Sequence, residues 1–326
     1  MPAMSTHPLP DHRLVKACQE IRNSEDPLCH LLHSPATHSL TQRLALIQTY
    51  NQMYGEDLIT HLATKSKLSP DLPYAVTLWL TDPHTRDALV VWQSLGIGVD
   101  CGADYKALVE IFVGRKSSHV LMIKQAYAAR FWRNLEQDII SIEPPSPFQK
   151  ILVALAASHK ALHVEASQHV AKCDAKRLFD TMEGKPGGSA VDEAVVLEIF
   201  CKRSIPQLKL TFSRYRQIYG HHYTKMLMKK NSREFEDALK IVIDCMCNAP
   251  RYYAKLFHAI IDGSARSGST LARVVVGRAE VDMGEIQREY ADKYGTTLLE
   301  AIYRRMPCGE FKDFIVALIS RTKINA

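Results

Sequence analysis

Residues Ala272–Gly295 read ARVVVGRAEVDMGEIQREYADKYG. From Met283 to Tyr294 the apolar and aromatic side chains recur every three or four residues, which places them on one face of a helix. Gly295 then supplies the left-handed conformation that commonly ends a helix. The valines near the start of the stretch predict a second, shorter helix, because they belong to a helical rather than an alternating pattern.

The predicted helix ends in an aromatic pair that has counterparts elsewhere in the chain. The pairs, each four residues apart, are Tyr50/Tyr54, Tyr127/Phe131, Tyr215/Tyr219 and Tyr290/Tyr294. Twelve residues before each pair stand, in chain order, His38, Arg115, Arg203 and Arg278. Glycine follows the pair in three copies and Trp132 follows it in the second. Because the surroundings recur together with the pairs, the sequence predicts four homologous units.

Each unit has room for about five helices, and strand patterns are nearly absent. We therefore expect an all-α fold made of four repeats. The predicted organisation is a short tail at residues 1–12 and repeats at 13–82, 83–157, 165–248 and 249–322.

Composition limits the class of protein. Of the 326 residues, 46% are hydrophobic and 23% are charged, which is typical of a globular chain. No apolar run approaches the roughly 18 residues of a membrane-spanning helix. The first twelve residues contain no apolar leader segment, and the eight cysteines form no C-x-x-C pair, so we expect a cytosolic protein with free thiols. The net charge of +6 is spread along the chain and does not indicate nucleic acid as a partner.

The fourfold repeat, its internal arginine and its aromatic helix end resemble the annexin family. The resemblance covers nearly the whole chain, and QTYNQMYGEDL (48–58) and LWLTDPHTRDA (78–88) resemble plant annexins in particular. It implies a curved disc of four repeats whose convex face binds calcium and, through calcium, acidic phospholipid. Calcium suits this role because it accepts several oxygen ligands in a flexible shell.

The resemblance also implies where calcium would bind. The family's site is a loop between the first two helices of a repeat that offers three backbone carbonyls, together with a carboxylate from a later loop. In the second repeat these positions fall on Gly98, Asp100 and Gly102, with Glu143 as the carboxylate. The alternative interpretation is a solvated glycine-rich loop and a glutamate that merely precedes two prolines.

The other three repeats depart from the pattern. The aligned positions are Ile21, Asn23, Glu25 and Lys67 in the first repeat, Pro186, Gly188, Ala190 and Lys230 in the third, and Ile261, Gly263, Ala265 and Met306 in the fourth. Lysine or methionine therefore replaces the carboxylate in all three. We expect weak calcium binding, at a single site or at none.

Basic residues occupy part of the same loops. Lys67 and Lys230 replace carboxylates, and Arg266 lies in the first loop of the fourth repeat. Each basic residue near an anionic membrane contributes on the order of 1 kcal/mol, so these three predict partly calcium-independent, salt-sensitive membrane binding. The alternative is that the loops have drifted to a neutral surface.

Four charged residues match positions that line the family's central polar channel: Asp87, Glu110, Arg115 and Arg273. We interpret them as a structural salt-bridge network rather than a route for ions. The resemblance implies no enzyme beyond weak peroxidase or nucleotidase activity suggested for some plant relatives. The segment 263–270 lacks the lysine of a phosphate-binding loop, and the histidine suggested for peroxidase-like activity aligns with Thr37.

The sequence therefore predicts a plant-type annexin with degenerate calcium sites that binds acidic phospholipid membranes peripherally. By resemblance alone, it would act in stress responses or membrane traffic. The alternative is a calcium-insensitive scaffold for cytoskeletal partners such as actin, or for other proteins. We expect a monomer or a weak oligomer.

Overall fold

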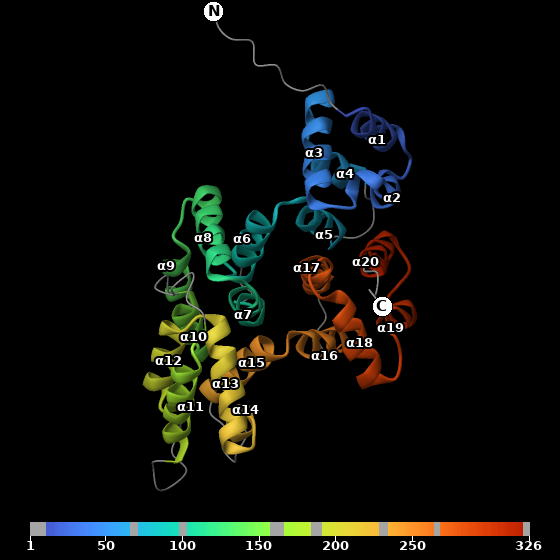
Figure 1. Cartoon of the computed structure of the whole chain (residues 1–326). Coiled ribbons are helices and arrows are strands. Elements are labelled where there is room, and N and C mark those ends of the chain that lie inside the picture. The colour runs from blue at the N-terminus through green and yellow to red at the C-terminus, as the bar shows by residue number, and fades with distance from the viewer. Residues whose placement is uncertain are drawn as a thin grey trace, which may run out of the picture. The chain divides into compact units, whose positions relative to one another are not determined.

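The computed structural model describes residues 11–65, 71–97, 103–156, 166–183, 191–227, 234–263 and 268–321. In these ranges every regular element is a helix, so the predicted all-α fold is confirmed (Figure 1). No helix within them is long and apolar enough to cross a bilayer.

The chain divides into two compact units, residues 1–82 with 253–326 and residues 83–252. The first contains α1 (His12–Asn23), α2 (Pro27–His33), the 3-10 helix η1 (Pro35–Thr37), α3 (Leu40–Tyr54), α4 (Leu58–Lys65), α5 (Asp71–Leu80), α17 (Gly268–Arg278), α18 (Met283–Tyr294), α19 (Leu298–Arg305) and α20 (Glu310–Ser320). The second contains α6 (Pro83–Ser94), α7 (Tyr105–Gly114), α8 (Ser117–Phe131), α9 (Leu135–Ile140), α10 (Pro147–Ala156), α11 (Gln168–Glu183), α12 (Glu193–Lys202), α13 (Ile205–Tyr219), α14 (Tyr223–Leu227) and α15 (Glu234–Cys247). The boundary falls within α16 (Ala249–Ile261).

We call α1–α5, α6–α10, α11–α15 and α16–α20 the first to fourth repeats. The repeat boundaries derived from the sequence stay a prediction. The first compact unit holds the first repeat and most of the fourth, and the second compact unit holds the second and third repeats.

The four aromatic pairs have nearly the same geometry. In each pair the ring centroids are 4.8–5.0 Å apart and the rings are tilted by 48–55°. The first member is buried in every case. A tilted arrangement at this distance is favourable for aromatic rings, so the third helix of each repeat carries the same packing element.

A flat side chain from the first helix of each repeat lies on the second aromatic residue. Trp92 stacks on Phe131 at 4.3 Å and 6°. In the third and fourth repeats, Phe179 stacks on Tyr219 at 4.0 Å and His258 stacks on Tyr294 at 3.8 Å. In the first repeat the guanidinium of Arg22 lies 5.2 Å from the ring centroid of Tyr54. These contacts attach the first helix of each repeat to the third.

The ends of the third helices explain the glycine in the repeat pattern. Gly55, Gly220 and Gly295 follow these helices with φ of +64°, +76° and +67°. Trp132 takes the same left-handed conformation with φ of +56°, although a side chain makes that conformation unfavourable. The second repeat therefore carries local strain that the other three avoid.

Contacts of two arginines, Arg43 and Arg321, join the N-terminal and C-terminal parts of the chain within the first unit. The guanidinium groups of Arg43 and Arg321 lie 5.2 and 5.1 Å from the ring centroid of Trp79. Arg43 is 1% exposed and pairs with Glu280 at 2.8 Å. Arg321 donates to the carbonyl of Leu32, and burial, together with the charge of Arg43, lowers its pKa. The first and fourth repeats therefore share one core.

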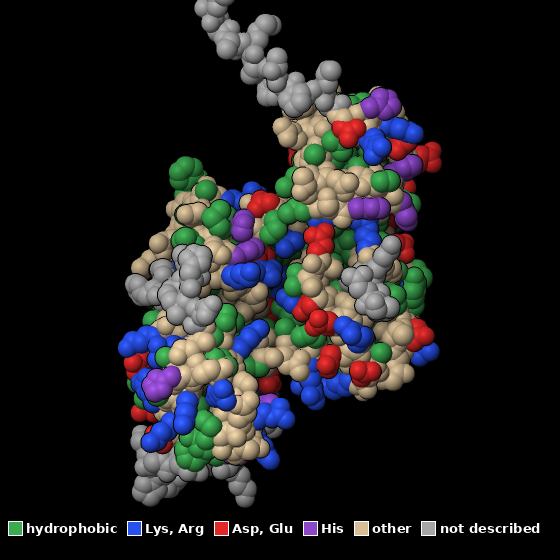
Figure 2. Space-filling view, in the orientation of Figure 1, with side chains coloured by type: hydrophobic (Ala, Val, Ile, Leu, Met, Phe, Trp, Pro, Cys, Tyr) green, Lys and Arg blue, Asp and Glu red, His purple; other side chains and the backbone are tan. Residues whose placement is uncertain are grey.

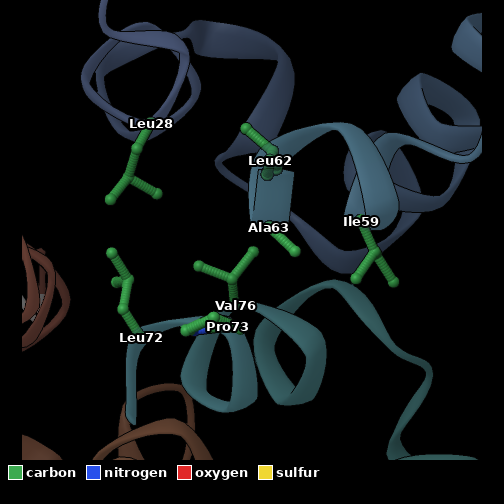
Figure 3. Close-up of a pocket in the computed structure, with 7 residues that line it drawn as sticks. All are labelled: Leu28, Ile59, Leu62, Ala63, Leu72, Pro73 and Val76. Atoms are coloured by element: carbon green, nitrogen blue, oxygen red, sulfur yellow. The ribbon is translucent and has the colours of Figure 1, made fainter. Parts of the chain in front are cut away.

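A pocket in the first unit lies between α2, α4 and α5 (Figure 3). Its lining consists of Leu28, Ile59, Leu62, Ala63, Leu72, Pro73 and Val76. All seven side chains are apolar, so they offer no polar group that would orient a ligand. We interpret this pocket as a packing gap between helices.

We expect Trp132→Gly to raise the free energy of unfolding by roughly 0.5–1 kcal/mol, because relief of the left-handed strain exceeds the entropy that glycine adds to the unfolded chain. The reverse change at the equivalent position, Gly220→Ala, is expected to lower it by about 1 kcal/mol. Denaturant unfolding of the three proteins measures both effects. A less stable Trp132→Gly variant would show that the tryptophan is not strained.

Candidate functional site

In the second repeat, two helices follow the connections that the resemblance assigns to calcium, and these helices begin side by side. Tyr105 begins α7 directly after the connection 95–104, and Phe148 lies at the start of α10 after the connection 141–146. The two rings stack with their centroids 5.7 Å apart and their planes 13° apart. The start of α7 therefore packs against the start of α10, which brings the ends of both connections together.

Glu143 lies in the second of these connections. Its side chain is exposed and has no hydrogen bond or ion pair with the residues that the structure describes. The pKa of Tyr105 is raised by burial and further by the negative charge of Glu143, so this carboxylate is close to the start of α7. Asp104 caps that helix by accepting from the backbone N–H of Ala107 at 3.1 Å.

The remaining predicted ligands of the second repeat, Gly98, Asp100 and Gly102, lie outside the described residues. The structure thus places Glu143 near the end of the predicted metal loop and does not describe the three loop positions themselves. In the described part of the chain, no three His, Cys, Asp or Glu side chains gather as a metal-binding group.

In the fourth repeat, basic side chains contact oxygens of the two connections that align with those of the second repeat. Arg305 Nη1 lies 3.2 Å from Oδ1 of Asp262, which precedes Gly263 in the first connection. The Nζ of the buried Lys312 donates to the carbonyls of Tyr303 at 3.0 Å and Met306 at 3.2 Å. Oxygens in both of the aligned connections of the fourth repeat are therefore already partnered by positive charge.

In the first repeat the connection is a short capped turn. Helix α1 ends at Asn23 and α2 begins at Pro27. Within the turn, Ser24 Oγ accepts from the N–H of Asp26 at 3.0 Å, and Asp26 Oδ1 accepts from Cys29 at 2.9 Å. Asp26 thus caps α2, and only three residues separate the helices.

Several further predicted positions fall outside the described residues. They are the basic residues Lys67, Lys230 and Arg266, and the loop positions Pro186, Gly188, Ala190 and Ala265. The contribution of the three basic residues to membrane binding stays a prediction.

Two of the four predicted channel residues form a buried ion pair. Arg115 donates to Asp87 through Nε at 2.6 Å and Nη2 at 3.2 Å. His119 Nε2 lies 3.0 Å from the same carboxylate, and Arg86 lies 3.7 Å from it. Burial alone would raise the pKa of Asp87, but the hydrogen bond with His119 and the charge of Arg115 hold it well below its usual value.

The other two channel residues lie on α7 and α17. Glu110 accepts from the hydroxyl of Tyr252 at 3.1 Å, within the second unit. Arg273 lies on α17 in the first unit. Convergence of all four charges therefore stays a prediction.

Two other recurring arginines also pair with aspartates, Arg203 with Asp174 and Arg278 with Asp282, and neither pairing was predicted from the sequence. Arg203 forms a fork with Asp174 at 2.6 and 3.1 Å, like that of Arg115 with Asp87. Each aspartate lies on the first helix of its repeat, 28 or 29 residues before its arginine. Arg278 bonds instead to Asp282, with Nε at 2.7 Å. The similar spacing of aspartate and arginine in the second and third repeats could have predicted the Arg203–Asp174 pair from the sequence.

Mouse annexin A3 is 32% identical over 287 residues, which are 88% of this chain and 85% of annexin A3. The chain belongs to the annexin family. The annexin family model matches residues 174–242 and 252–318. The solved structure of annexin III has a TM-score of 0.80 at 28% identity, covering 98% of this annexin and 96% of annexin III.

The comparisons do not separate plant from animal relatives. Arabidopsis thaliana annexin D3 is 32% identical over 282 residues, covering 86% of this chain and 85% of annexin D3, the same identity as mouse annexin A3. Annexins typically bind acidic phospholipid in a calcium-dependent way and are generally not enzymes. This chain therefore belongs to a family of peripheral membrane-binding proteins.

The buried pair predicts an acid-sensitive contribution to stability. We expect Asp87→Ala to lower the free energy of unfolding by about 3 kcal/mol, because it removes the buried carboxylate that pairs with the partly buried Arg115. A carboxyl whose pKa is lower in the folded than in the unfolded state stabilises the fold. This stabilisation is complete at pH values above the unfolded-state pKa, near 4, and it is lost as the pH falls through the folded-state pKa. Wild-type stability should therefore fall below about pH 4 more steeply than that of Asp87→Asn.

Denaturant unfolding between pH 7 and pH 2.5 measures this difference. The exposed ion pair of Asp262 with Arg305 provides the control. Asp262→Ala should change the free energy of unfolding by less than about 1 kcal/mol. Equal acid sensitivity of wild type and Asp87→Asn would contradict the assignment.

Proposed function

We propose that this annexin binds acidic phospholipid surfaces peripherally, with calcium held by the second repeat alone. The observation that carries the proposal is the contrast between two carboxylates. Glu143 is exposed beside the start of α7 and has no partner among the described residues. In the fourth repeat Asp262 is paired with Arg305, so an ion there would compete with a built-in cation.

The residues of the second repeat fit the chemistry of calcium. The carbonyls of Gly98, Asp100 and Gly102 would supply three oxygens and Glu143 one carboxylate. Calcium accepts six to eight oxygen ligands, which leaves positions for water or for the phosphate of a lipid. The ion would therefore join two anionic groups that repel each other in its absence.

Glu143→Gln should raise the calcium concentration needed for half-maximal vesicle binding by about tenfold or more, because a coordinating charge is lost. Glu25→Gln is the matched control, since it removes the same charge from the connection of the first repeat and should have no effect. Co-sedimentation with phosphatidylserine vesicles across a calcium titration measures both. Equal calcium requirements of Glu143→Gln and wild type would contradict a site at Glu143.

We propose further that Lys67, Lys230 and Arg266 attach the protein to anionic lipid without calcium. Each contributes on the order of 1 kcal/mol at low ionic strength, so Lys67→Gln, Lys230→Gln and Arg266→Gln combined should abolish most binding in chelator. Added salt should do the same to wild type, because surface charges are screened within about 10 Å at 0.1 M.

The triple variant separates this attachment from calcium binding, because it should still pellet when calcium is added. Undiminished binding of the triple variant in chelator would contradict the role of these three residues. Absence of vesicle binding both with calcium and at low salt would favour the scaffold alternative.

A further inference from the structure

Helix α11 carries an exposed cysteine and an exposed histidine on one face. The Sγ atom of Cys173 lies 3.7 Å from Nε2 of His169, since side chains four residues apart are neighbours on a helix. Both residues are exposed to solvent, and neither makes another hydrogen bond or an ion pair with the residues that the structure describes. The pair is therefore accessible to a ligand from solution.

The distance between the two atoms matches that between two ligands on one zinc ion. Zinc lies about 2.3 Å from a thiolate sulfur and about 2.0–2.1 Å from an imidazole nitrogen, in tetrahedral geometry. Two such ligands on one ion are then about 3.6 Å apart, and Sγ and Nε2 are 3.7 Å apart here. A metal ion could take the place of the proton between sulfur and nitrogen with little movement of either side chain.

Helix α2 carries a similar pair that differs in one respect. The Sγ atom of Cys29 lies 3.5 Å from Nδ1 of His33, again four residues apart. The same nitrogen lies 2.8 Å from the carbonyl oxygen of Cys29. Because a carbonyl oxygen can only accept, Nδ1 carries a proton and cannot coordinate a metal ion without losing this bond. Of these two pairs, only the one on α11 leaves the nitrogen that faces the sulfur without a backbone partner.

The charges near Cys173 come from α11 and from the end of α12. Arg203 lies close to the thiol, because the charge of Cys173 adds to the larger effect of the Asp174 hydrogen bond in raising the pKa of Arg203. The fork with Asp174 balances this guanidinium. Lys172 and Lys176 are exposed, and basic side chains reach the surface over α11 and α12 (Figure 2). Water and salt screen such exposed charges, so they weaken a metal site here without excluding it.

We propose that Cys173 and His169 form a binding site for a thiophilic metal ion of the zinc type. Soft thiolate ligands select such ions, whereas calcium takes oxygen ligands. No three potential ligands gather in the described part of the chain, so two protein atoms hold the ion and water fills its remaining positions. The site lies on α11 in the third repeat, and it does not depend on the calcium site of the proposed function.

The proposal has a consequence for the pH dependence of binding. The thiolate and the unprotonated ring nitrogen are the ligands, so the ion displaces the proton that lies between Cys173 and His169. Metal affinity should therefore rise with pH, because protons compete with the metal ion for the same two atoms.

Cobalt absorbance tests the site directly. Co²⁺ accepts the same ligands as zinc, and a thiolate ligand gives it a strong charge-transfer band in the near ultraviolet. Full-length, reduced protein is titrated with Co²⁺ in the presence of excess calcium. We expect a band that saturates at an equimolar ratio of Co²⁺ to protein, that calcium does not reduce and that added Zn²⁺ removes.

Variants identify the ligands. Cys173→Ser should abolish the band, and His169→Gln should weaken Co²⁺ binding by about tenfold or more, since the loss of even an indirect partner of a metal costs that much. Cys29→Ser is the matched control on α2 and should leave the band unchanged. Combining Lys172→Gln with Lys176→Gln should tighten binding, because two charges that repel the ion are removed.

Three outcomes would overturn the proposal. One is the absence of a thiolate band in the wild type, and another is a full band in Cys173→Ser, which would place the metal at a different cysteine. The third is unchanged affinity in His169→Gln, which would show a thiol that binds without the histidine. Calcium-dependent vesicle pelleting of Cys173→Ser should equal that of wild type, so failure of this site is distinguishable from failure of the proposed function.

Discussion

The packing of each repeat depends on the contact between a flat side chain of its first helix and the aromatic pair of its third. Trp92 on Phe131 and Phe179 on Tyr219 are nearly parallel stacks, and the fourth repeat uses His258 in the same role. Stacked rings bury large apolar areas and also fix the orientation of the two helices. The residue type changes among tryptophan, phenylalanine, histidine and arginine, but the flat shape is kept, which is what the contact requires.

The connections between the helices do not take part in this aromatic contact, and their side-chain partners differ from repeat to repeat. In the second repeat the rings of Tyr105 and Phe148 hold two connections together and leave Glu143 exposed. In the fourth, Arg305 pairs with Asp262 across the corresponding connections. An ion pair and a bound cation can both reduce repulsion between oxygen-rich loops. An ion pair at these connections can therefore help to hold the helices of a repeat together without a bound metal.

Local patterns identified the two helices of the stretch 272–295 correctly. The spacing of Met283, Ile286 and Tyr290 predicted a helix that ends before Gly295, and α18 ends at Tyr294. The valines near Ala272 predicted a shorter helix before it, and α17 runs from Gly268 to Arg278. Helix ends depend on capping contacts of single residues, so they are less certain than the periodic interior.

The sequence by itself determined the helical class, the recurrence of the aromatic pairs and the left-handed positions after them, because these depend on side chains a few residues apart. Only the tertiary structure decided which distant groups meet. Asp87 joins Arg115 across 28 residues, and Trp79 meets both Arg43 and Arg321. Such contacts depend on how helices pack in three dimensions, and no local period encodes that arrangement. The same reason explains why Glu143 could be named from an aligned spacing, while its exposure and its position beside Tyr105 required the fold.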